Sequence, residues 1–410
     1  MRVGLPREQW RRNRLAINIA AALIFSGFTF VMPFLPLYVG ELGVQGQAEI
    51  ATWSGLLLTT APLLAGLLGP LWGRLGDRFG MKIMVERATF AMALHWGLFG
   101  FAQNTYHLLM LRIMLGLLGG FGSLAMPLLV AATPREHMSR SIGGLQTVQM
   151  VSAAVGPVIG GFLADWIGIR TTCLVSSAFG LAALVLINRL YREGGAGERL
   201  AGKETGGHRI SFGQAVSYPA FWIMVAVMFL VSFVERSFSP VVPLYILTLG
   251  TGIDNAARTA GTIISLGLFA EAVSATVLGS RLRKAPPRAL LLWRLAGGAL
   301  LCVPMGLVWA TPQLLALRIA LGLLAGGCMV VVYTLGSQII PAETRATSFS
   351  FLASAALLGG ATGPTIAGLL THLSIRTIFF FNSFLYCALW LAAWRTVPRR
   401  PAGDACMPRA

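Results

Sequence analysis

Long apolar segments recur along the 410 residues of this chain and limit its fold more than any other feature. A helix needs about 20 apolar residues to cross a bilayer, and twelve segments reach that length. They cover residues 14–39, 50–72, 83–103, 106–131, 142–163, 171–190, 218–248, 258–280, 289–310, 313–338, 346–370 and 377–397. The sequence therefore predicts an all-α membrane protein with twelve transmembrane helices.

Composition and segment length exclude two other classes of protein. Only 11% of the residues are charged, against about 25% in soluble domains, so the chain cannot supply the polar surfaces of several soluble domains. The first apolar segment follows a basic N-terminus, as in a signal peptide. It exceeds the roughly 7–15 apolar residues of such a peptide, and we expect it to be retained as the first span.

The net charge of +17 raises the question of nucleic acid, because basic proteins often neutralise phosphate. The basic residues instead gather at the N-terminus, in the even-numbered connections and after the last span. The opposite connections contain only Arg170, Arg258 and Arg376. This bias is the positive-inside rule. We predict a multi-pass protein of a bacterial inner (plasma) membrane with both termini in the cytoplasm and no nucleic-acid partner.

An internal repeat divides the chain. Residues 108–120 reappear at 314–326 with ten of thirteen positions identical, a shift of 206. Within one residue, the same shift relates Gly156-Pro157 of the fifth span to Gly363-Pro364 of the eleventh. The chain is therefore expected to form two six-helix halves of parallel topology.

The two halves are expected at 1–191 and 214–410, with a polar, glycine-rich cytoplasmic linker at 192–213. Parallel halves enclose a cavity near the bilayer midplane, and rocking opens it alternately to each side. Glycines are abundant and charges persist inside the spans. Secondary transport is thus favoured over the alternative of a non-transporting receptor or scaffold.

A charged, glycine-rich motif follows the second span: Gly73-Arg-Leu-Gly-Asp-Arg-Phe-Gly-Met-Lys82. It resembles the loop motif of the major facilitator superfamily, with Met81 where a basic residue is usual. A carboxylate here can cap a helix N-terminus or pair with arginine. The resemblance implies a gating latch at the cytoplasmic ends of the halves, and a solvated turn is the alternative. The latch residues are Gly73, Asp77, Arg78, Gly80 and Lys82.

Arg112 lies inside the fourth span, four residues before Gly116. This arrangement resembles the superfamily's motif in that span, and in proton-coupled relatives the arginine is implicated in proton transfer. An arginine inside a span costs about 2.5–3.5 kcal/mol and usually faces the bundle interior or a water-filled cavity. The alternative is that Arg112 extends to the outer headgroups, because it lies only about six residues into its helix.

The fifth span contains Gly156, Pro157, Gly160 and Gly161. The pattern resembles the motif of the superfamily's exporters, with Ser152 in place of its leading glycine. Proline bends a helix, while glycines permit close helix contact, although generic small-residue packing would look similar. The branch most resembled is that of the twelve-span drug:proton antiporters, which includes bacterial multidrug exporters.

Glu235 and Glu271 lie far from either end of the seventh and eighth spans. A carboxyl group in apolar surroundings can bind and release a proton near neutral pH. Glu235 is our first candidate for the proton or a competing cationic substrate, and Glu271 is the second. Arg236 points about 100° away from Glu235 and could neutralise a carboxylate elsewhere. The alternative role for each glutamate is a structural ion pair between spans 7 and 8.

Two further observations bear on coupling. The first span contains no acid, although many drug antiporters carry one there, so uncoupled or differently coupled transport stays open. His95 in the third span is a candidate proton relay, but a hydrogen-bonded packing histidine is favoured.

These features predict a secondary active transporter rather than an enzyme. The favoured function is proton-coupled export of drugs or other amphipathic or hydrophobic small molecules, and the alternative is uptake or facilitated transport of a sugar or organic acid. Its partners are the substrate, protons and the lipid bilayer, and the chain is expected to act as a monomer. Residues 197–204 match a phosphate loop except that Glu204 replaces its Ser or Thr. We therefore expect the proton gradient to supply the energy, with no cofactor and no metal.

The latch hypothesis predicts that Asp77→Asn impairs transport while leaving substrate affinity largely intact, because the change acts on gating. Transport into vesicles and equilibrium substrate binding should be measured on the same preparation. Loss of binding alone would contradict a gating role.

Overall fold

A computed structural model of the chain describes residues 7–192, 219–281, 286–339 and 345–397. All of its regular elements in these ranges are helices. The predicted linker lies outside the described residues from residue 193 onward, so the division of the chain at 192–213 stays a prediction.

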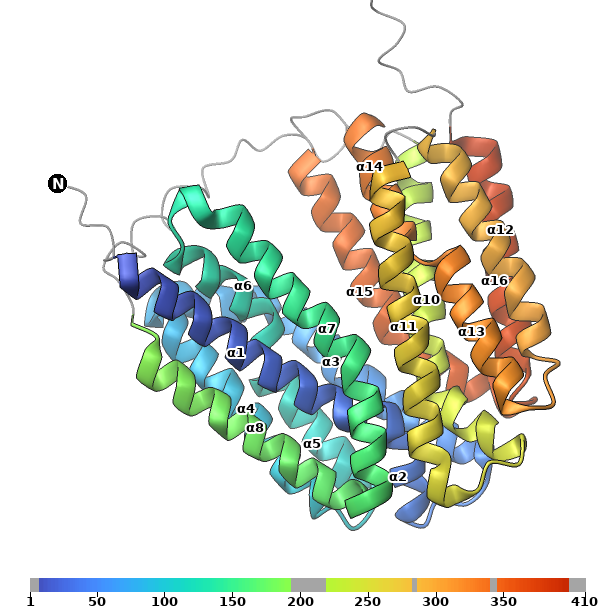
Figure 1. Ribbon diagram of the computed structural model, residues 1–410, viewed down its shortest axis with the longest axis horizontal. Helices are drawn as coiled ribbons and strands as arrows, with labels where there is room; N and C mark the ends of the chain where they lie inside the picture. The colour runs from blue at the N-terminus through green and yellow to red at the C-terminus, as the bar shows by residue number, and fades with distance from the viewer. Residues whose placement is uncertain (1–6, 193–218, 282–285, 340–344, 398–410) are drawn as a thin grey trace, which may run out of the picture. The chain divides into compact units, whose positions relative to one another are not determined.

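The helices follow the twelve predicted segments closely (Figure 1). The first half contains α1 (Arg7–Val31), the 3-10 turn η1 (Met32–Phe34), α2 (Leu35–Glu41), α3 (Gln47–Phe79), α4 (Met81–Gly100), α5 (Thr105–Leu118), α6 (Phe121–Ala132), η2 (Arg135–His137), α7 (Met138–Ile167) and α8 (Ile169–Leu190). The second half contains α10 (Pro219–Thr248), η4 (Ile253–Asn255), α11 (Ala256–Arg281), α12 (Pro287–Met305), α13 (Thr311–Ala325), α14 (Cys328–Ile339), α15 (Arg345–Leu370) and α16 (Thr377–Thr396).

Ten stretches of helix in the described residues are long and apolar enough to cross a membrane. The third predicted span, α4, is not among them because Lys82, Glu86 and Arg87 lie in its first two turns. The fourth is divided, and its first part, α5, is a shorter apolar helix of 14 residues. The all-α membrane fold is confirmed, with spans less uniform than the sequence suggested.

Three predicted spans are interrupted rather than continuous. Span 1 passes through η1, where Pro33 removes a main-chain donor at the start of the turn. Span 4 breaks at Gly119 and Gly120, and span 10 at Gly326 and Gly327. The second glycine of each pair has a positive φ, 102° at Gly120 and 76° at Gly327, a conformation that glycine adopts without strain.

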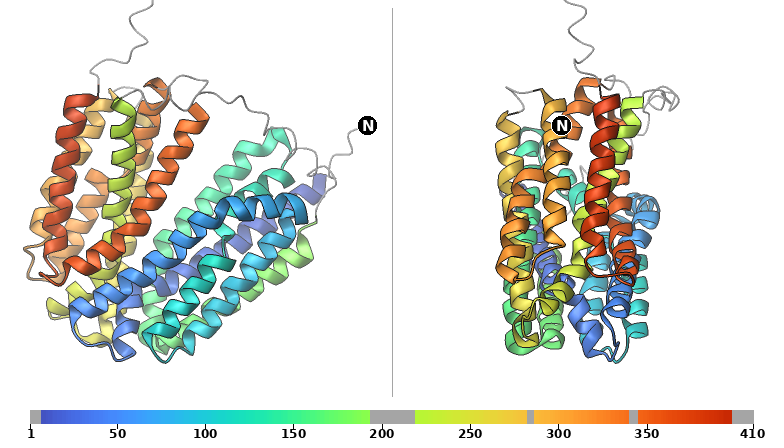
Figure 2. Two further views of the ribbon diagram at one scale, coloured as in Figure 1. Left: turned by 180° about the vertical axis from the view of Figure 1, so that it is seen from behind. Right: turned by 90° about the vertical axis from the view of Figure 1, so that its right-hand side faces the viewer.

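The described chain forms two compact units. Unit 1 consists of residues 7–44, 57–192 and 252–265; unit 2 consists of 45–56, 219–251, 266–281, 286–339 and 345–397. Helices α3 and α11 therefore each begin in one unit and end in the other. In unit 2, α10 packs along α15 and α12 packs along α16, as Figure 2 shows from two sides.

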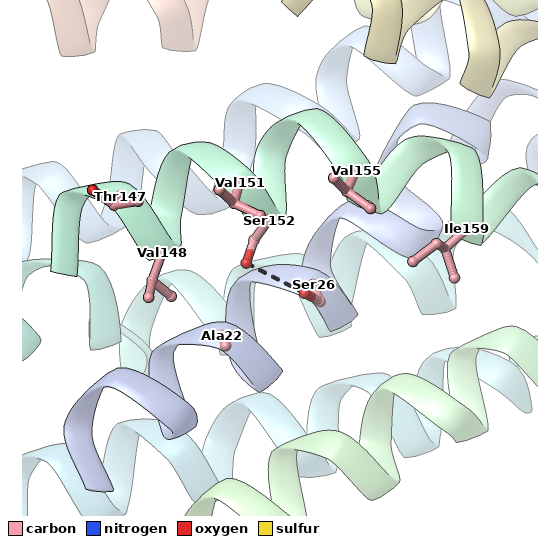
Figure 3. Close-up of a pocket in the computed structure, with 9 residues that line it drawn as sticks. Ala22, Ser26, Thr147, Val148, Val151, Ser152, Val155 and Ile159 are labelled. Atoms are coloured by element: carbon pink, nitrogen blue, oxygen red, sulfur yellow. Dashed lines mark hydrogen bonds between the residues drawn. The ribbon is translucent and has the colours of Figure 1, made fainter. Parts of the chain in front are cut away.

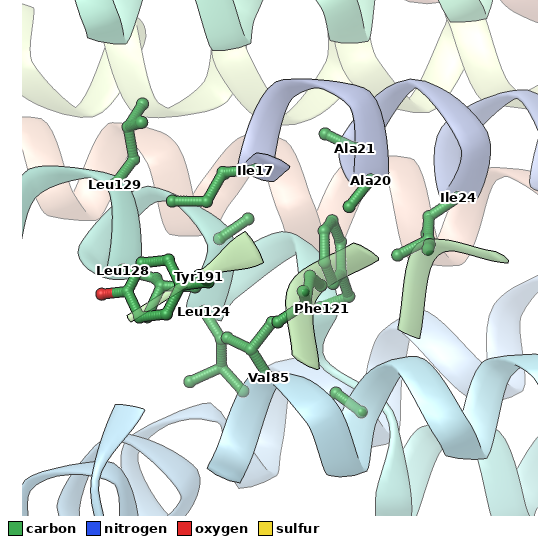
Figure 4. Close-up of a cluster of buried hydrophobic side chains, with 14 of the residues drawn as sticks. Ile17, Ala20, Ala21, Ile24, Val85, Phe121, Leu124, Leu128, Leu129 and Tyr191 are labelled. Carbon is green, nitrogen blue, oxygen red and sulfur yellow. The ribbon is translucent and has the colours of Figure 1, made fainter. Parts of the chain in front are cut away.

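The core of unit 1 lies among α1, α4, α6 and α8 (Figure 4). Small residues of α1 such as Ala20 and Ala21 admit larger side chains, including Phe121 and Leu128 of α6. All four of these side chains are buried. This packing fixes α1 in the unit, and with it the face of α1 that meets α7.

Glycines set the spacing between the paired helices of both units. In unit 1, Cβ atoms at Gly156 and Gly160 of α7 would collide with Thr29 and Phe30 of α1. In unit 2, Cβ atoms at Gly359 and Gly363 of α15 would collide with main-chain oxygens of α10, and the repeat relates Gly363 to Gly156. Small residues let main chains approach closely in membranes, where helix association depends on packing contacts.

A second crossing in each unit involves the first turns of α11 or α3. In unit 1, the main-chain N–H of Arg258 on α11 donates to Asp165 Oδ2 on α7 at 3.0 Å. In unit 2, Thr52 Oγ1 on α3 donates to the carbonyl of Gly368 on α15 at 3.2 Å. The crossings are related by the internal repeat, so the repeat extends from sequence to packing.

The close α1–α7 contact predicts that Gly160→Ala lowers the free energy of unfolding by about 1–3 kcal/mol, the usual effect of overpacking. Gly143→Ala on the same helix is the matched control, because nothing lies within 4 Å of a Cβ there. Thermal unfolding of the purified protein in detergent measures both. Equal stabilities for the two variants would show that the contact does not limit packing.

Candidate functional site

Two carboxyl groups meet in unit 2. The side chains of Glu235 of α10 and Glu271 of α11 lie close enough for their carboxyl groups to share a hydrogen bond, and both residues are partly buried. An ionised carboxylate only accepts hydrogen bonds. A hydrogen bond between the two carboxyl groups would therefore require one proton held between them. The two glutamates predicted as separate candidates form one pair, which we call the carboxyl pair.

Arg318 of α13 supplies positive charge beside this pair. It is only 6% exposed, and its charge acts on Glu235. Its guanidinium carbon lies 5.0 Å from the centroid of the Phe238 ring, within the range of a cation–π contact. Gly267 of α11 makes room for the arginine, since a Cβ there would lie 2.8 Å from Arg318 Cγ.

Arg318 was not predicted as a site residue, although a signal for it was present. It occupies the position that the repeat relates to Arg112. Arg236, which was predicted, is exposed, and its Cγ lies near Gly360 of α15. Its charge still acts on Glu235, but the two neighbouring side chains occupy different surroundings.

Arg112 belongs to unit 1 and has no carboxylate partner among the described residues. Its side chain is 1% exposed, so the guanidinium lies inside the helix bundle rather than at its outer end. Nη2 donates to the sulfur of Met32 in η1 at 2.7 Å. Nε and Nη1 have no hydrogen-bond partner among the described residues. The structure thus places a buried cation against the break in span 1.

His95 lies beside Arg112. Its Nδ1 is 3.1 Å from the carbonyl oxygen of Leu111, and its ring packs against Trp96 and Phe99. The described residues provide no partner for Nε2 of His95 or Nε1 of Trp96. These contacts give His95 the surroundings of a packing histidine.

A cleft lies between α1 and α7 in unit 1 (Figure 3). Its volume is about 280 Å³, near the lower limit for ligand pockets. The hydroxyl of Ser26 donates to that of Ser152 at 3.3 Å across the cleft. The walls are mostly apolar and carry a few hydroxyl groups. The remaining lining residues are Ala22, Thr147, Val148, Val151, Val155, Gly156 and Ile159.

The exporter-type motif lies within α7, which continues through Pro157. The N–H of Val158 donates to Ser265 Oγ of α11 at 3.1 Å. Gly156 and Gly160 face α1, whereas a Cβ at Gly161 would lie 2.6 Å from the carbonyl oxygen of Ala257 on α11. The motif therefore serves two helix contacts.

The latch motif is mostly helical, which corrects the expected loop. Helix α3 has 33 residues and continues to Phe79, beyond the apolar segment that ends at residue 72. Continuing the helix keeps the main-chain groups of the motif hydrogen-bonded within it. Gly80, with φ 95°, forms the turn before α4. Lys82 pairs with Glu86 at 3.7 Å. The surroundings of Gly73 and the side chain of Asp77 lie outside the described part, whereas the Arg78 guanidinium lies over the Phe79 ring.

Comparison with known sequences identifies the family. A sequence model described as Major Facilitator Superfamily matches residues 17–313 and 297–405. A protein named multidrug resistance protein MdtG from Klebsiella pneumoniae (strain 342) is 32% identical over 401 residues, which cover 97% of this chain and 96% of the relative. A protein of the same name from Yersinia enterocolitica is 32% identical over 393 residues, covering 96% and 94%.

Solved structures with low sequence identity share the fold. A bacterial homologue of the human lysosomal transporter Spinster, in an inward-facing and occupied conformation, has a TM-score of 0.76 at 16% identity. The match covers 96% of this chain and 98% of that one. A D-xylose–proton symporter has a TM-score of 0.71 at 16% identity, covering 94% and 98%.

The different surroundings of the two repeat-related arginines predict opposite effects on stability. Arg112→Met removes a buried charge that has no carboxylate partner, so stability should stay constant or rise. Arg318→Met removes the buried one of the two arginines whose charges act on Glu235 and should lower the free energy of unfolding by about 3–5 kcal/mol. Thermal unfolding in detergent at pH 8 provides the measurement. An equal loss in both variants would show that Arg112 has a counter-charge.

Proposed function

The chain belongs to the major facilitator superfamily, and from this premise we propose that it exports drugs or other amphipathic small molecules in exchange for protons. It is a multi-pass secondary transporter of the inner membrane and not an enzyme. The proposed substrate class is supported by the MdtG relatives, whose names describe multidrug resistance. Neither the uptake alternative nor the receptor alternative has comparable support.

The carboxyl pair is the observation that carries proton coupling. With one shared proton the pair has a charge of about −1, and the positive charges of Arg236 and the buried Arg318 act on it. Burying separate charges is unfavourable, whereas a balanced and hydrogen-bonded group is tolerated. Loss of the shared proton leaves two carboxylates side by side, and like charges this close repel strongly. Release of the proton therefore requires either a compensating cation or a change in the surrounding helices.

Exchange follows from this charge balance. A positively charged group of a substrate can replace the proton at the pair, and a proton can in turn displace the substrate. Competition of this kind makes the two ligands bind in alternation, which an antiporter requires. Alternating access then releases each ligand on the opposite side of the membrane. The absence of an acid in the first span is thus compatible with coupling from the other half of the sequence.

The cleft between α1 and α7 suits part of an amphipathic molecule. Valine and isoleucine side chains can contact an apolar group, while Ser26 and Ser152 can each bind a polar substituent. A small number of placed polar groups in an apolar pocket gives orientation and specificity. We assign the cleft to one portion of the substrate.

The remaining assignments rest on sequence. The proposed latch residue is Asp77, and the proposed helix contacts that permit rocking are Gly156, Gly160 and Gly161. Arg112 is proposed to take part in proton movement in unit 1. Both termini are proposed to lie in the cytoplasm, and the chain to act as a monomer.

Inverted membrane vesicles with an imposed pH gradient test the function. Candidate drugs should dissipate the gradient, and expression should lower drug accumulation in cells. Sugars and organic acids, applied in the same assay, test the uptake alternative. If no drug dissipates the gradient and accumulation is unchanged, the antiporter proposal fails.

The carboxyl pair predicts that Glu235→Gln and Glu271→Gln each abolish drug-driven proton release, because an amide cannot share a titrating proton. Glu49→Gln, an exposed residue in the first turn of α3, is the matched control and should retain coupling. Proton release on drug addition should be followed with a pH-sensitive dye across the pH range. Coupling that persists in both pair variants with an unchanged pH profile would exclude the pair as the proton site.

A further inference from the structure

The breaks in spans 4 and 10 are matched by a pair of arginines. The guanidinium Nη2 of Arg87 on α4 donates to the carbonyl of Gly119 at 3.2 Å. The guanidinium Nη1 of Arg294 on α12 donates to the carbonyl of Gly326. The two arginines are 207 residues apart, and so are the two glycines. The shift of 206 that relates residues 108–120 to 314–326 would pair Gly119 with Ala325, so the correspondence is structural: each arginine donates to the first glycine of its break.

Each contact closes the end of a helix. Gly119 directly follows α5, and Gly326 directly follows α13. The last carbonyls of a helix have no partner within it and carry partial negative charge. An arginine donates a hydrogen bond to such a carbonyl, and its positive charge offsets the partial negative charge there. In a span, where lipid offers no replacement donor, such a contact decides whether a break stays closed.

The two arginines differ in their surroundings. The Arg87 guanidinium lies over the Trp72 ring, 3.5 Å from its centroid. Arg294 instead makes a second bond, from Nη1 to Ser274 Oγ at 2.7 Å. Ser274 lies three residues after Glu271, and residues at that spacing share one face of a helix. Arg294 is therefore held within one turn of the carboxyl pair.

Glu271 also touches the break directly. A Cβ at Gly326 would lie 2.8 Å from Glu271 Cγ, so the glycine whose carbonyl Arg294 caps packs against the side chain of the pair. The hydroxyl of Ser274 donates to the carbonyl of Leu323 at 2.6 Å. Glu271, Ser274, Gly326 and Arg294 thus meet at one place in unit 2. The first half has Ala65 where the repeat places Glu271.

We propose that Arg294 is a positioning residue that links proton release from the carboxyl pair to the break in span 10. While the pair holds its proton, Arg294 caps Gly326 and the break is closed. When both carboxylates are charged, Arg294 turns to Glu271, and the carbonyl of Gly326 loses its donor. The break then opens, and α13 moves relative to α14. This inference rests on the proposed function of the pair.

Other charged or titratable groups surround the carboxyl pair, but none of those described below makes the two contacts that Arg294 makes. Arg318 acts on Glu235 and is held over Phe238, and Arg236 is exposed. Two thiols and a phenol from the other packed helices complete the surroundings: Cys302 of α12, Cys328 of α14 and Tyr386 of α16. Among the described groups, Arg294 is the cation that contacts both the Glu271 face of α11 and the break.

Hydrogen–deuterium exchange of the full-length protein in nanodiscs tests the proposal. Peptides that span the two breaks, residues 320–330 and 113–123, are compared at pH 6 and pH 9 after correction for intrinsic exchange. We expect the peptide at Gly326 to exchange about tenfold faster at pH 9, because a charge-assisted bond is lost. The peptide at Gly119 should show no such excess.

Three variants distinguish a link between the carboxyl pair and the break from a purely structural role of Arg294 as a cap. Glu271→Gln should abolish the pH-dependent excess while the break stays protected. Arg294→Gln should expose the peptide at Gly326 at both pH values. Arg87→Gln, the matched control, should expose the peptide at Gly119 at both pH values and leave the pH response at Gly326 unchanged.

Two results would overturn the proposal: no excess in the native protein, or an excess that persists in Glu271→Gln. The second comparison needs no change at Arg294, so it holds even if Arg294→Gln fails to fold. The vesicle assay identifies which idea fails. If the glutamine variants lose coupling but the excess is absent, only the link through Arg294 is wrong. If the glutamine variants keep coupling, the proposed function of the carboxyl pair is wrong.

Discussion

Every polar main-chain group inside a bilayer must find its partner within the protein, and the rest of this structure follows from that constraint. It explains why the described chain is helical almost throughout. It also explains why helix breaks are few and are associated with glycine or proline. At the breaks in spans 4 and 10, an arginine from a neighbouring helix supplies the missing donor. In spans 4 and 10, the helix is therefore interrupted where a neighbouring arginine side chain donates to the carbonyl that the break leaves without a partner.

The internal repeat gives both halves the same backbone plan but different charges. Glycine contacts, broken spans and arginine caps recur at shifts of 206 or 207 residues. The carboxyl pair does not recur, because Phe28 and Ala65 stand where the repeat places Glu235 and Glu271. Arg318 consequently has an acidic neighbour in Glu235, whereas Arg112 has the sulfur of Met32 and the ring of His95. One half contains a carboxyl pair with positive charge beside it, and the other contains a buried arginine with no carboxylate partner among the described residues.

The sequence was sufficient to predict where the spans lie, because apolar length can be read from each segment by itself, but it did not predict the breaks in spans 1, 4 and 10. It could place Glu235 and Glu271 deep in their spans, but not in contact, since contact depends on the rotation and register of α10 against α11. Glycines at the latch suggested a turn, yet α3 continues and Gly80 alone forms the turn. Arg294 looked like one more basic residue at the cytoplasmic side, and its role as a cap became visible only with the break at Gly326.

The crossing helices α3 and α11 have a consequence for how the molecule is assembled. Each compact unit contains a helix end that comes from the other half of the sequence. A gene divided at the polar linker would encode two fragments, and neither would contain all the residues of one unit. Complementation between such fragments would have to exchange these helix ends before either unit is complete. Co-translational insertion of the first six spans therefore leaves unit 1 unfinished until the eighth has been synthesised.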